Sequence, residues 1–253
     1  MKEKHINILL QKKNKHNIRI IWLHGWGQDS SAFAQLVPKF SNYENISIDL
    51  PGFGSNKPPQ EVWGTKNYAD YVVKYLSKLP AKKTYIIGHS FGCRVALRIA
   101  EKEPNLLAGL ILIAAAGLKR KRSLIFRLKA SCLKLFVKIM KIIDYFFNSK
   151  FKEKFANNFG SADYREAQGI MRKIFVKTII EDLSEIACKI KLTTLLIYGG
   201  KDQQTPPELG KKYNILIENS QYFELAQFDH YNILTNGRHQ LHNIITKHIE
   251  RSK

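Results

Sequence analysis

The run from Leu107 to Ala116, LAGLILIAAA, is apolar at every position. A strand with one face in water alternates apolar and polar residues, so a continuous apolar run indicates a strand that is covered on both faces. Such strands occur in parallel sheets, because the connections between parallel strands place helices over both faces. This segment therefore predicts an α/β protein with a buried parallel sheet. The chain of 253 residues is long enough for one large domain of this kind.

The rest of the chain repeats this pattern, because short β-branched runs alternate with stretches of helical periodicity. From Gly117 to about Lys191 the sequence is helical and basic, and it shows no strand pattern. We therefore expect one α/β core made of residues 1–117 and 191–253, with residues 118–190 inserted as a helical cap, or lid. The expected strands cover residues 18–24, 45–50, 83–88, 107–116, 193–200 and 220–225, and the expected helices cover residues 30–40, 67–79, 90–104, 206–214 and 233–250.

The stretch GHSFG, Gly88 to Gly92, stands where an expected strand gives way to an expected helix. A turn this sharp brings backbone against backbone, and glycine avoids the clash that a Cβ atom would cause. The turn places Ser90 at a helix N-terminus, where free N–H groups stabilise a developing anion. Ser90 could merely cap the helix, but a parallel-sheet context on both sides favours a nucleophile.

A serine hydroxyl needs a base, and His230 is the best placed of the eight histidines. It lies in a loop between the last expected strand and the last expected helix, and such a loop can reach over the sheet edge. We expect His24 to bond to backbone in its own loop, and His89 to line the pocket or pack. The remaining histidines lie in charged or helical contexts and are expected to be solvated: His5, His16, His239, His242 and His248.

The base in turn needs a carboxylate that orients its ring, and Asp202 follows an expected strand at the same sheet edge. Asp229 is adjacent to His230 and would have to turn back onto its own neighbour's ring. Asp182 lies at the end of the expected cap, where it more readily caps a helix or forms an ion pair. We therefore favour Asp202, which also gives the chain order serine, aspartate, histidine of one class of hydrolase.

An oxyanion formed at Ser90 would need two backbone N–H donors. The N–H of Phe91, the residue after the nucleophile, is the first candidate. The second should come from the loop after an early strand, and HGWG at residues 24–27 predicts the N–H of Trp26.

Taken together and in order, HGWG, DLPGFG, GHSFG, YGGKD and FDH resemble the α/β-hydrolase superfamily from Ile18 to Lys247. This resemblance implies the α/β-hydrolase fold, with a mostly parallel sheet of eight strands flanked by helices and a helical cap after strand six. It also implies a hydrolase that uses no metal and no organic cofactor. The sequence departs from the usual pattern at FDHYNI, where most relatives have a glycine before the histidine, and at Cys93, which we expect to be a small buried residue.

Within the superfamily, HGWG followed by DLPGFG is similar to pimeloyl-carrier-protein methyl ester esterases of biotin synthesis, to carbon–carbon bond hydrolases and to many carboxylesterases. These similarities narrow the substrate little. We expect a serine esterase, and the substrate we favour is an acyl thioester- or acyl-carrier-linked methyl ester. A lipid or short-chain carboxylesterase acting at an anionic membrane surface is the alternative, as is a ligand-binding protein without catalytic activity. An apolar acyl pocket in the cap has four loose candidates, each of which could equally pack within the cap: Phe126, Phe136, Phe146 and Phe147.

The chain carries a formal net charge of +20, and half of this excess falls in residues 117–154, which hold twelve Lys or Arg and two Asp or Glu. Such a basic segment can be a solvated helix face, a docking site for an acidic carrier protein, or a contact with an anionic membrane. Nucleic acid is not expected, because no binding motif is recognised. Five cations share one face of the expected helix and are candidate partner-binding residues: Arg120, Arg127, Lys134, Lys138 and Lys141.

The sequence also indicates a compartment. The N-terminal apolar run, residues 6–10, is too short for a signal peptide, and no run approaches the ~20 apolar residues of a spanning helix. The three cysteines are far apart and odd in number, which is typical of structural thiols under reducing conditions. We therefore expect a cytoplasmic protein.

Overall fold

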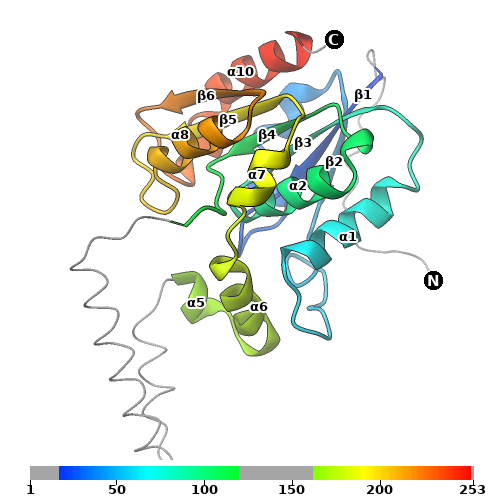
Figure 1. The fold of residues 1–253 in the computed structure, drawn as a ribbon, viewed down its shortest axis with the longest axis vertical. Helices are drawn as coiled ribbons and strands as arrows, with labels where there is room; N and C mark the ends of the chain where they lie inside the picture. The colour runs from blue at the N-terminus through cyan, green and yellow to red at the C-terminus, as the bar shows by residue number, and fades with distance from the viewer. Residues whose placement is uncertain (1–16, 120–161, 252–253) are drawn as a thin grey trace, which may run out of the picture.

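The computed structural model describes residues 17–119 and 162–251, and these form a parallel sheet covered by helices (Figure 1). The sheet has six strands in the order β2-β1-β3-β4-β5-β6, and every neighbouring pair is parallel. The strands are β1 (Ile18–Leu23), β2 (Glu44–Ile48), β3 (Lys83–His89), β4 (Gly109–Ile113), β5 (Thr194–Gly199) and β6 (Ser220–Leu225).

Strands β1, β4 and β5 are buried along their whole length, and the inner strand β3 is buried except at its first residue, Lys83, as the apolar run around β4 predicts. Only the edge strand β6 alternates between partly buried and exposed positions. One face of the sheet is covered by α1, α2, α7 and α8, and the other by two 3₁₀ helices, Ser30–Phe33 and Val37–Phe40, and by α9 and α10. The helices are α1 (Thr65–Leu76), α2 (Phe91–Lys102), α5 (Ala162–Glu166), α6 (Gly169–Ile180), α7 (Ser184–Lys189), α8 (Pro207–Leu216), α9 (Asn232–Thr235) and α10 (Arg238–Arg251).

Two expected helices are broken in the structure. Residues 30–40 form two short 3₁₀ helices, Ser30–Phe33 and Val37–Phe40, rather than one helix. A proline in the first turn of the second piece explains the break, since proline starts a helical turn but cannot continue one. The C-terminal helix divides into α9 and α10 around Gly237, where a Cβ atom would lie 2.4 Å from the Ile233 carbonyl oxygen.

The strand count differs from the eight that the family resemblance implies. The described residues form six strands, so that the basic insertion follows β4, the fourth strand, rather than a sixth. Residues 1–16, which precede β1, and most of the expected cap, residues 120–161, lie outside the described residues. The boundaries of core and cap remain a prediction. Helix α7, near the C-terminal end of the expected cap, packs against α2 and α8. Its residues Ile186 and Ala187 are buried.

The parallel arrangement positions the candidate residues. Parallel strands end at a common edge of the sheet, and loops at that edge are where α/β proteins place their sites. The loop after β1 carries Trp26, the turn after β3 carries Ser90, the loop after β5 carries Asp202, and the loop after β6 carries His230. No helix within residues 17–119 and 162–251 is long and apolar enough to cross a membrane.

We expect Gly92→Ala to destabilise the protein by about 3 kcal/mol, because α2 lies directly against the end of β1. A Cβ atom at position 92 would lie 2.0 Å from the Leu23 carbonyl oxygen, so that helix and strand would have to separate. Urea unfolding measures this loss. Gly64→Ala is the matched control, since its Cβ atom would meet the ends of two side chains and no backbone, with Glu181 at 2.8 Å and Lys177 at 3.3 Å. Equal stability of the two variants would contradict the close helix–strand approach.

Candidate active site

The turn between β3 and α2 holds Ser90 in a backbone conformation that few residues other than glycine adopt. Its φ is 50° and its ψ is −106°. This conformation costs roughly 1–3 kcal/mol and persists only where the surroundings enforce it. Here the Ser90 N–H donates to the Ile113 carbonyl at 3.0 Å. A Cβ atom at Gly88 would lie 2.8 Å from the Cys93 nitrogen, so the tight turn also requires glycine at this position.

Asp202 and His230 come from different loops and meet in the interior. His230 Nδ1 lies 2.7 Å from Asp202 Oδ2, and the two residues are 4% and 3% exposed. Burial alone would raise the pKa of Asp202, but hydrogen bonds and charge from His230, with hydrogen bonds from Thr205, hold it below its ordinary value. With Nδ1 donating to the carboxylate, Nε2 of the neutral ring is left as an acceptor, which is the tautomer that a general base needs.

Ser90, the candidate nucleophile, is linked to this pair by contacts of the adjacent residue, His89. The His89 and His230 rings are 4.9 Å apart at their centroids, and His89 Nε2 lies 2.9 Å from the His230 carbonyl oxygen. Burial, followed by the charge of His230, lowers the pKa of His89 to about 3, so this ring is neutral at physiological pH. Both Ser90 and His230 belong to the described residues, and the structure places no hydrogen bond between Ser90 Oγ and the His230 ring. Such bonds are often long before substrate binds.

The alternative acids have other partners. Asp229 accepts hydrogen bonds from the N–H groups of Tyr231 and Asn232, and so caps the turn into α9. Asp182 accepts from Ser184 at the start of α7 and lies 3.6 Å from Lys119. The geometry therefore leaves Asp202 as the carboxylate in contact with His230.

Of two further histidines, the surroundings of His24 agree with the expectation from the sequence and those of His248 do not. His24 Nε2 accepts from the Leu50 N–H at 3.0 Å, and its Nδ1 lies 2.8 Å from the Gly25 carbonyl oxygen, as expected for a loop-holding residue. His248, which we expected to be solvated, is instead 7% exposed on the inner side of α10. Helix α10 packs on the sheet at this position, and the charged residues around His248 in the sequence give no indication of this contact.

The two residues that carry the candidate oxyanion donors touch through their side chains. The rings of Trp26 and Phe91 are 5.3 Å apart at their centroids. Phe91 is the first residue of α2, where a backbone N–H has no partner within the helix. The loop that carries Trp26 is held by Gln28, whose side-chain oxygen accepts from the Gly25 N–H at 3.0 Å and lies 3.0 Å from His89 Nδ1. The assignment of these two N–H groups as an oxyanion hole remains a prediction.

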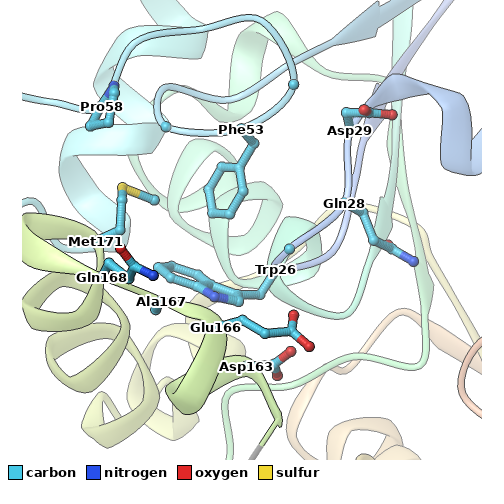
Figure 2. A pocket seen from close by; sticks show the side chains of 13 residues that line it. Trp26, Gln28, Asp29, Phe53, Pro58, Asp163, Glu166, Ala167, Gln168 and Met171 are labelled. Atoms are coloured by element: carbon cyan, nitrogen blue, oxygen red, sulfur yellow. The ribbon is translucent and has the colours of Figure 1, made fainter. Parts of the chain in front are cut away.

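A cavity of about 450 Å³ opens on the Trp26 side of the site, between the loops after β1 and β2 and the helices α5 and α6 (Figure 2). Trp26, Phe53 and Met171 form an apolar wall, while Asp163 and Glu166 present their carboxylates below the indole. Burial raises the pKa of Asp163, and the charge of Glu166 adds to this. The cavity is large enough for part of a small acyl substrate.

Comparison with known proteins adds the family. The model of the α/β hydrolase fold family matches residues 18–237. The chain belongs to this family. An uncharacterized hydrolase of Bacillus subtilis, YugF, is 27% identical over 225 residues, which cover 83% of this chain and 82% of that protein.

Two further relatives of this α/β hydrolase are informative. A pimeloyl-[acyl-carrier protein] methyl ester esterase of Shewanella woodyi is 35% identical over 97 residues, which span 38% of this chain and 36% of that enzyme. The solved structure of MenH from S. aureus is 22% identical and has a TM-score of 0.71, with coverage of 98% of this chain and 99% of that one. The structural likeness supports the fold.

Several residues proposed from the sequence lie outside the described residues. These are the five partner-binding cations and the four cap phenylalanines, all within residues 120–161. Of the cysteines, Cys93 is fully buried, as expected, and Cys188 is exposed. Among the described residues, no group of three or more His, Cys, Asp or Glu could hold a metal ion. The expected absence of a cofactor remains a prediction.

Sequence reasoning missed Thr205, which lies at the centre of the acid–base pair. Its Oγ1 lies 2.7 Å from Asp202 Oδ2, 3.1 Å from His230 Nδ1 and 3.0 Å from the Ala114 carbonyl oxygen. Its N–H donates to Asp202 Oδ1 at 2.8 Å. The only sequence signal was its position three residues after the candidate acid. At this spacing a hydroxyl side chain can form a hydrogen bond with a carboxylate of the same loop.

We expect Thr205→Val to lower kcat about tenfold while Thr205→Ser keeps most of the activity. Loss of the hydroxyl raises the pKa of Asp202, because Thr205 helps to lower it. The acid limb of the kcat/KM profile, which depends on the charged carboxylate of Asp202, should therefore move to higher pH in the valine variant only. A pH series on the three proteins measures this. Unchanged limbs with reduced activity would indicate a purely structural role for Thr205.

Proposed function

We propose that this α/β hydrolase is a serine hydrolase that cleaves a carboxylic ester through Ser90, His230 and Asp202. The observation that carries the proposal is the buried 2.7 Å contact between His230 Nδ1 and Asp202 Oδ2 beside a serine with φ of 50° at a helix N-terminus. A strained serine beside an oriented imidazole is the arrangement that activates a hydroxyl for attack.

The proposed reaction proceeds in two halves. Ser90 Oγ attacks the ester carbonyl carbon while its proton passes to His230 Nε2. Asp202 stabilises the imidazolium that forms. His230 then returns the proton to the departing alcohol oxygen, which leaves an acyl group on Ser90. A water molecule, deprotonated by His230, attacks this acyl group and releases the acid, and the proton returns to Ser90.

The negative charge on the carbonyl oxygen needs donors at the moment of attack. In the proposed mechanism these are the N–H groups of Trp26 and Phe91, whose rings lie in contact. The α2 N-terminus adds a partial positive charge at the same place. Gln28 and His89 connect the loop after β1 to the His230 backbone. The loop that carries Trp26 and the loop that carries His230 are therefore held by the same two side chains.

For the substrate we propose an acyl-carrier-linked methyl ester. The partial similarity to a pimeloyl-[acyl-carrier protein] methyl ester esterase supports this choice. The basic segment supports it too, since a carrier protein is acidic and Arg120, Arg127, Lys134, Lys138 and Lys141 could steer it to the site.

A lipid ester at an anionic membrane surface is the second candidate. It is favoured by a 33% match over 111 residues to the probable lysophospholipase BODYGUARD 2 of Arabidopsis thaliana, which covers 41% of this chain and 23% of that protein. The same basic segment would then lie against the anionic surface.

A substrate panel tests the proposal. The purified protein is given p-nitrophenyl acetate and butyrate, an acyl-carrier-linked methyl ester, the free methyl ester of the same acid, and a lysophospholipid in anionic vesicles. We expect the carrier-linked ester to be hydrolysed with the highest kcat/KM. Preference for the lysophospholipid would favour the second candidate. No turnover of any ester would contradict ester hydrolysis and favour a ligand-binding protein.

A further inference from the structure

A second cavity, of about 390 Å³, lies away from the Trp26 cavity and shares no lining residue with it. It lies between the first turn of α2, the end of α6, the segment after β4 and the loop after β5. The exposed Lys119 lines its rim, and the apolar side chains of its wall are Ala116, Leu118, Ile179, Ile180 and Leu209.

Within this apolar wall lies the guanidinium of Arg94, on the first turn of α2. Arg94 is only 8% exposed, and burial lowers its pKa. Arginine is rarely buried to this extent without a carboxylate partner. Here its one partner among the described residues is the backbone carbonyl oxygen of Glu181, which accepts from Nη1 at 3.2 Å. A guanidinium has five N–H donors, so most of its capacity is unused.

The carboxylates closest in sequence to this carbonyl bind elsewhere. The Glu181 carboxylate accepts from the Thr65 N–H at 3.1 Å and lies 3.7 Å from Arg98. The Asp182 carboxylate is occupied by Ser184 and Lys119. Neither carboxylate forms an ion pair with Arg94, and their charges only partly offset the lowering of its pKa by burial. Within residues 17–119 and 162–251 this buried cation therefore has no paired anion.

We propose that this cavity binds the carboxylate of an acid with an apolar chain, and that Arg94 holds the carboxylate. A planar guanidinium matches a carboxylate through two parallel hydrogen bonds. The apolar side chains offer their surface to a hydrocarbon chain, and Ile179 and Ile180, which are 48% and 67% exposed, leave this surface within reach of a ligand from solvent. Removing a buried cation's partner is costly, whereas supplying one from a ligand recovers that free energy.

The cavity also borders the acid–base pair. Gln204 and Thr205 line it, and the N–H groups of these two residues each donate to Asp202 Oδ1 at 2.8 Å. A carboxylate bound at Arg94 is therefore either a free acid held next to the machinery or the far end of a substrate.

Binding of octanoate to the Ser90→Ala protein, measured by calorimetry, tests this site without requiring any reaction at Ser90. We expect octanoate to bind at least about tenfold more tightly than octanol, the same chain without the charge. Arg94→Met should weaken octanoate binding about 10- to 100-fold. Lys102→Met removes a cation from the exposed end of the same helix, where Lys102 pairs with Asp70 at 2.6 Å, and should leave binding unchanged.

The thermal stability of Arg94→Met separates binding from structure. Since methionine replaces an unpaired buried charge, its Tm should equal or exceed that of the parent. If Arg94→Met does not fold, Arg94→Lys decides: a folded lysine variant that still prefers octanoate to octanol supports the site. Failure of both variants to fold, equal binding of octanol, or octanoate binding unaffected by Arg94→Met would overturn it.

A second arm distinguishes the two sources of the carboxylate, and it alone depends on the proposed ester hydrolysis. The active protein is given monomethyl octanedioate and dimethyl octanedioate. A preference for the monoanion that disappears in Arg94→Met identifies the far end of a substrate. Equal turnover of both esters, with octanoate binding intact, identifies a separate free acid.

Discussion

Ser90→Ala is expected to reduce kcat by about 10⁶-fold for any ester that the parent protein hydrolyses. The alanine keeps the turn but removes the oxygen that attacks the carbonyl carbon, so no acyl group can form on the protein. The backbone strain at this position, with φ of 50°, remains in the variant. Its unfolding free energy should therefore stay within about 1 kcal/mol of the parent value.

Initial rates with p-nitrophenyl butyrate measure this loss, and a urea titration of the same preparation measures stability. Ser31→Ala is the matched control, because Ser31 is an exposed residue of the 3₁₀ helix at Ser30–Phe33. It should keep full activity. Activity within a factor of ten of the parent in Ser90→Ala would remove Ser90 from the mechanism.

Asp202→Asn is expected to reduce kcat about 10⁴-fold, the second largest effect. An amide cannot stabilise the imidazolium, and its N–H group facing His230 Nδ1 would favour the tautomer that leaves Nε2 protonated. The substitution is nearly isosteric at a 3% exposed position, and the N–H groups of Gln204 and Thr205 still have an oxygen acceptor. KM should change far less than kcat.

Asp229→Asn is the control for this substitution, because Asp229 adjoins His230 in sequence but caps the turn into α9. An asparagine can accept the same two hydrogen bonds, so its kcat should remain within about threefold of the parent. A larger loss in Asp229→Asn than in Asp202→Asn would reverse the assignment of the acid.

The buried strands and the Ser90 turn could be predicted because their signals are local. The apolar run around β4 requires cover on both faces, and residues 220–225 form β6 with the bounds expected from the sequence. The glycines at 88 and 92 are needed for contacts within a few residues or with the neighbouring strand, and their pattern is visible in the sequence.

Other features depend on contacts between distant segments, and these left no local signal. Residues 30–40 have the composition of one helix, but the sheet face they cover holds two short 3₁₀ pieces around Trp22. The role of Thr205 follows from the approach of His230, which is 25 residues away. Arg94 has the sequence context of an ordinary helix residue, and its burial depends on segments that are distant in sequence, α6 among them.

The central claim is that Ser90, His230 and Asp202 act together, and labelling with a fluorophosphonate probe followed by peptide mapping tests it most directly. We predict one phosphonylated residue, Ser90, in the parent protein, with labelling at least about 100-fold slower in His230→Ala and Asp202→Asn. Labelling at another residue, or labelling of Ser90 at the same rate in all three proteins, would contradict the account.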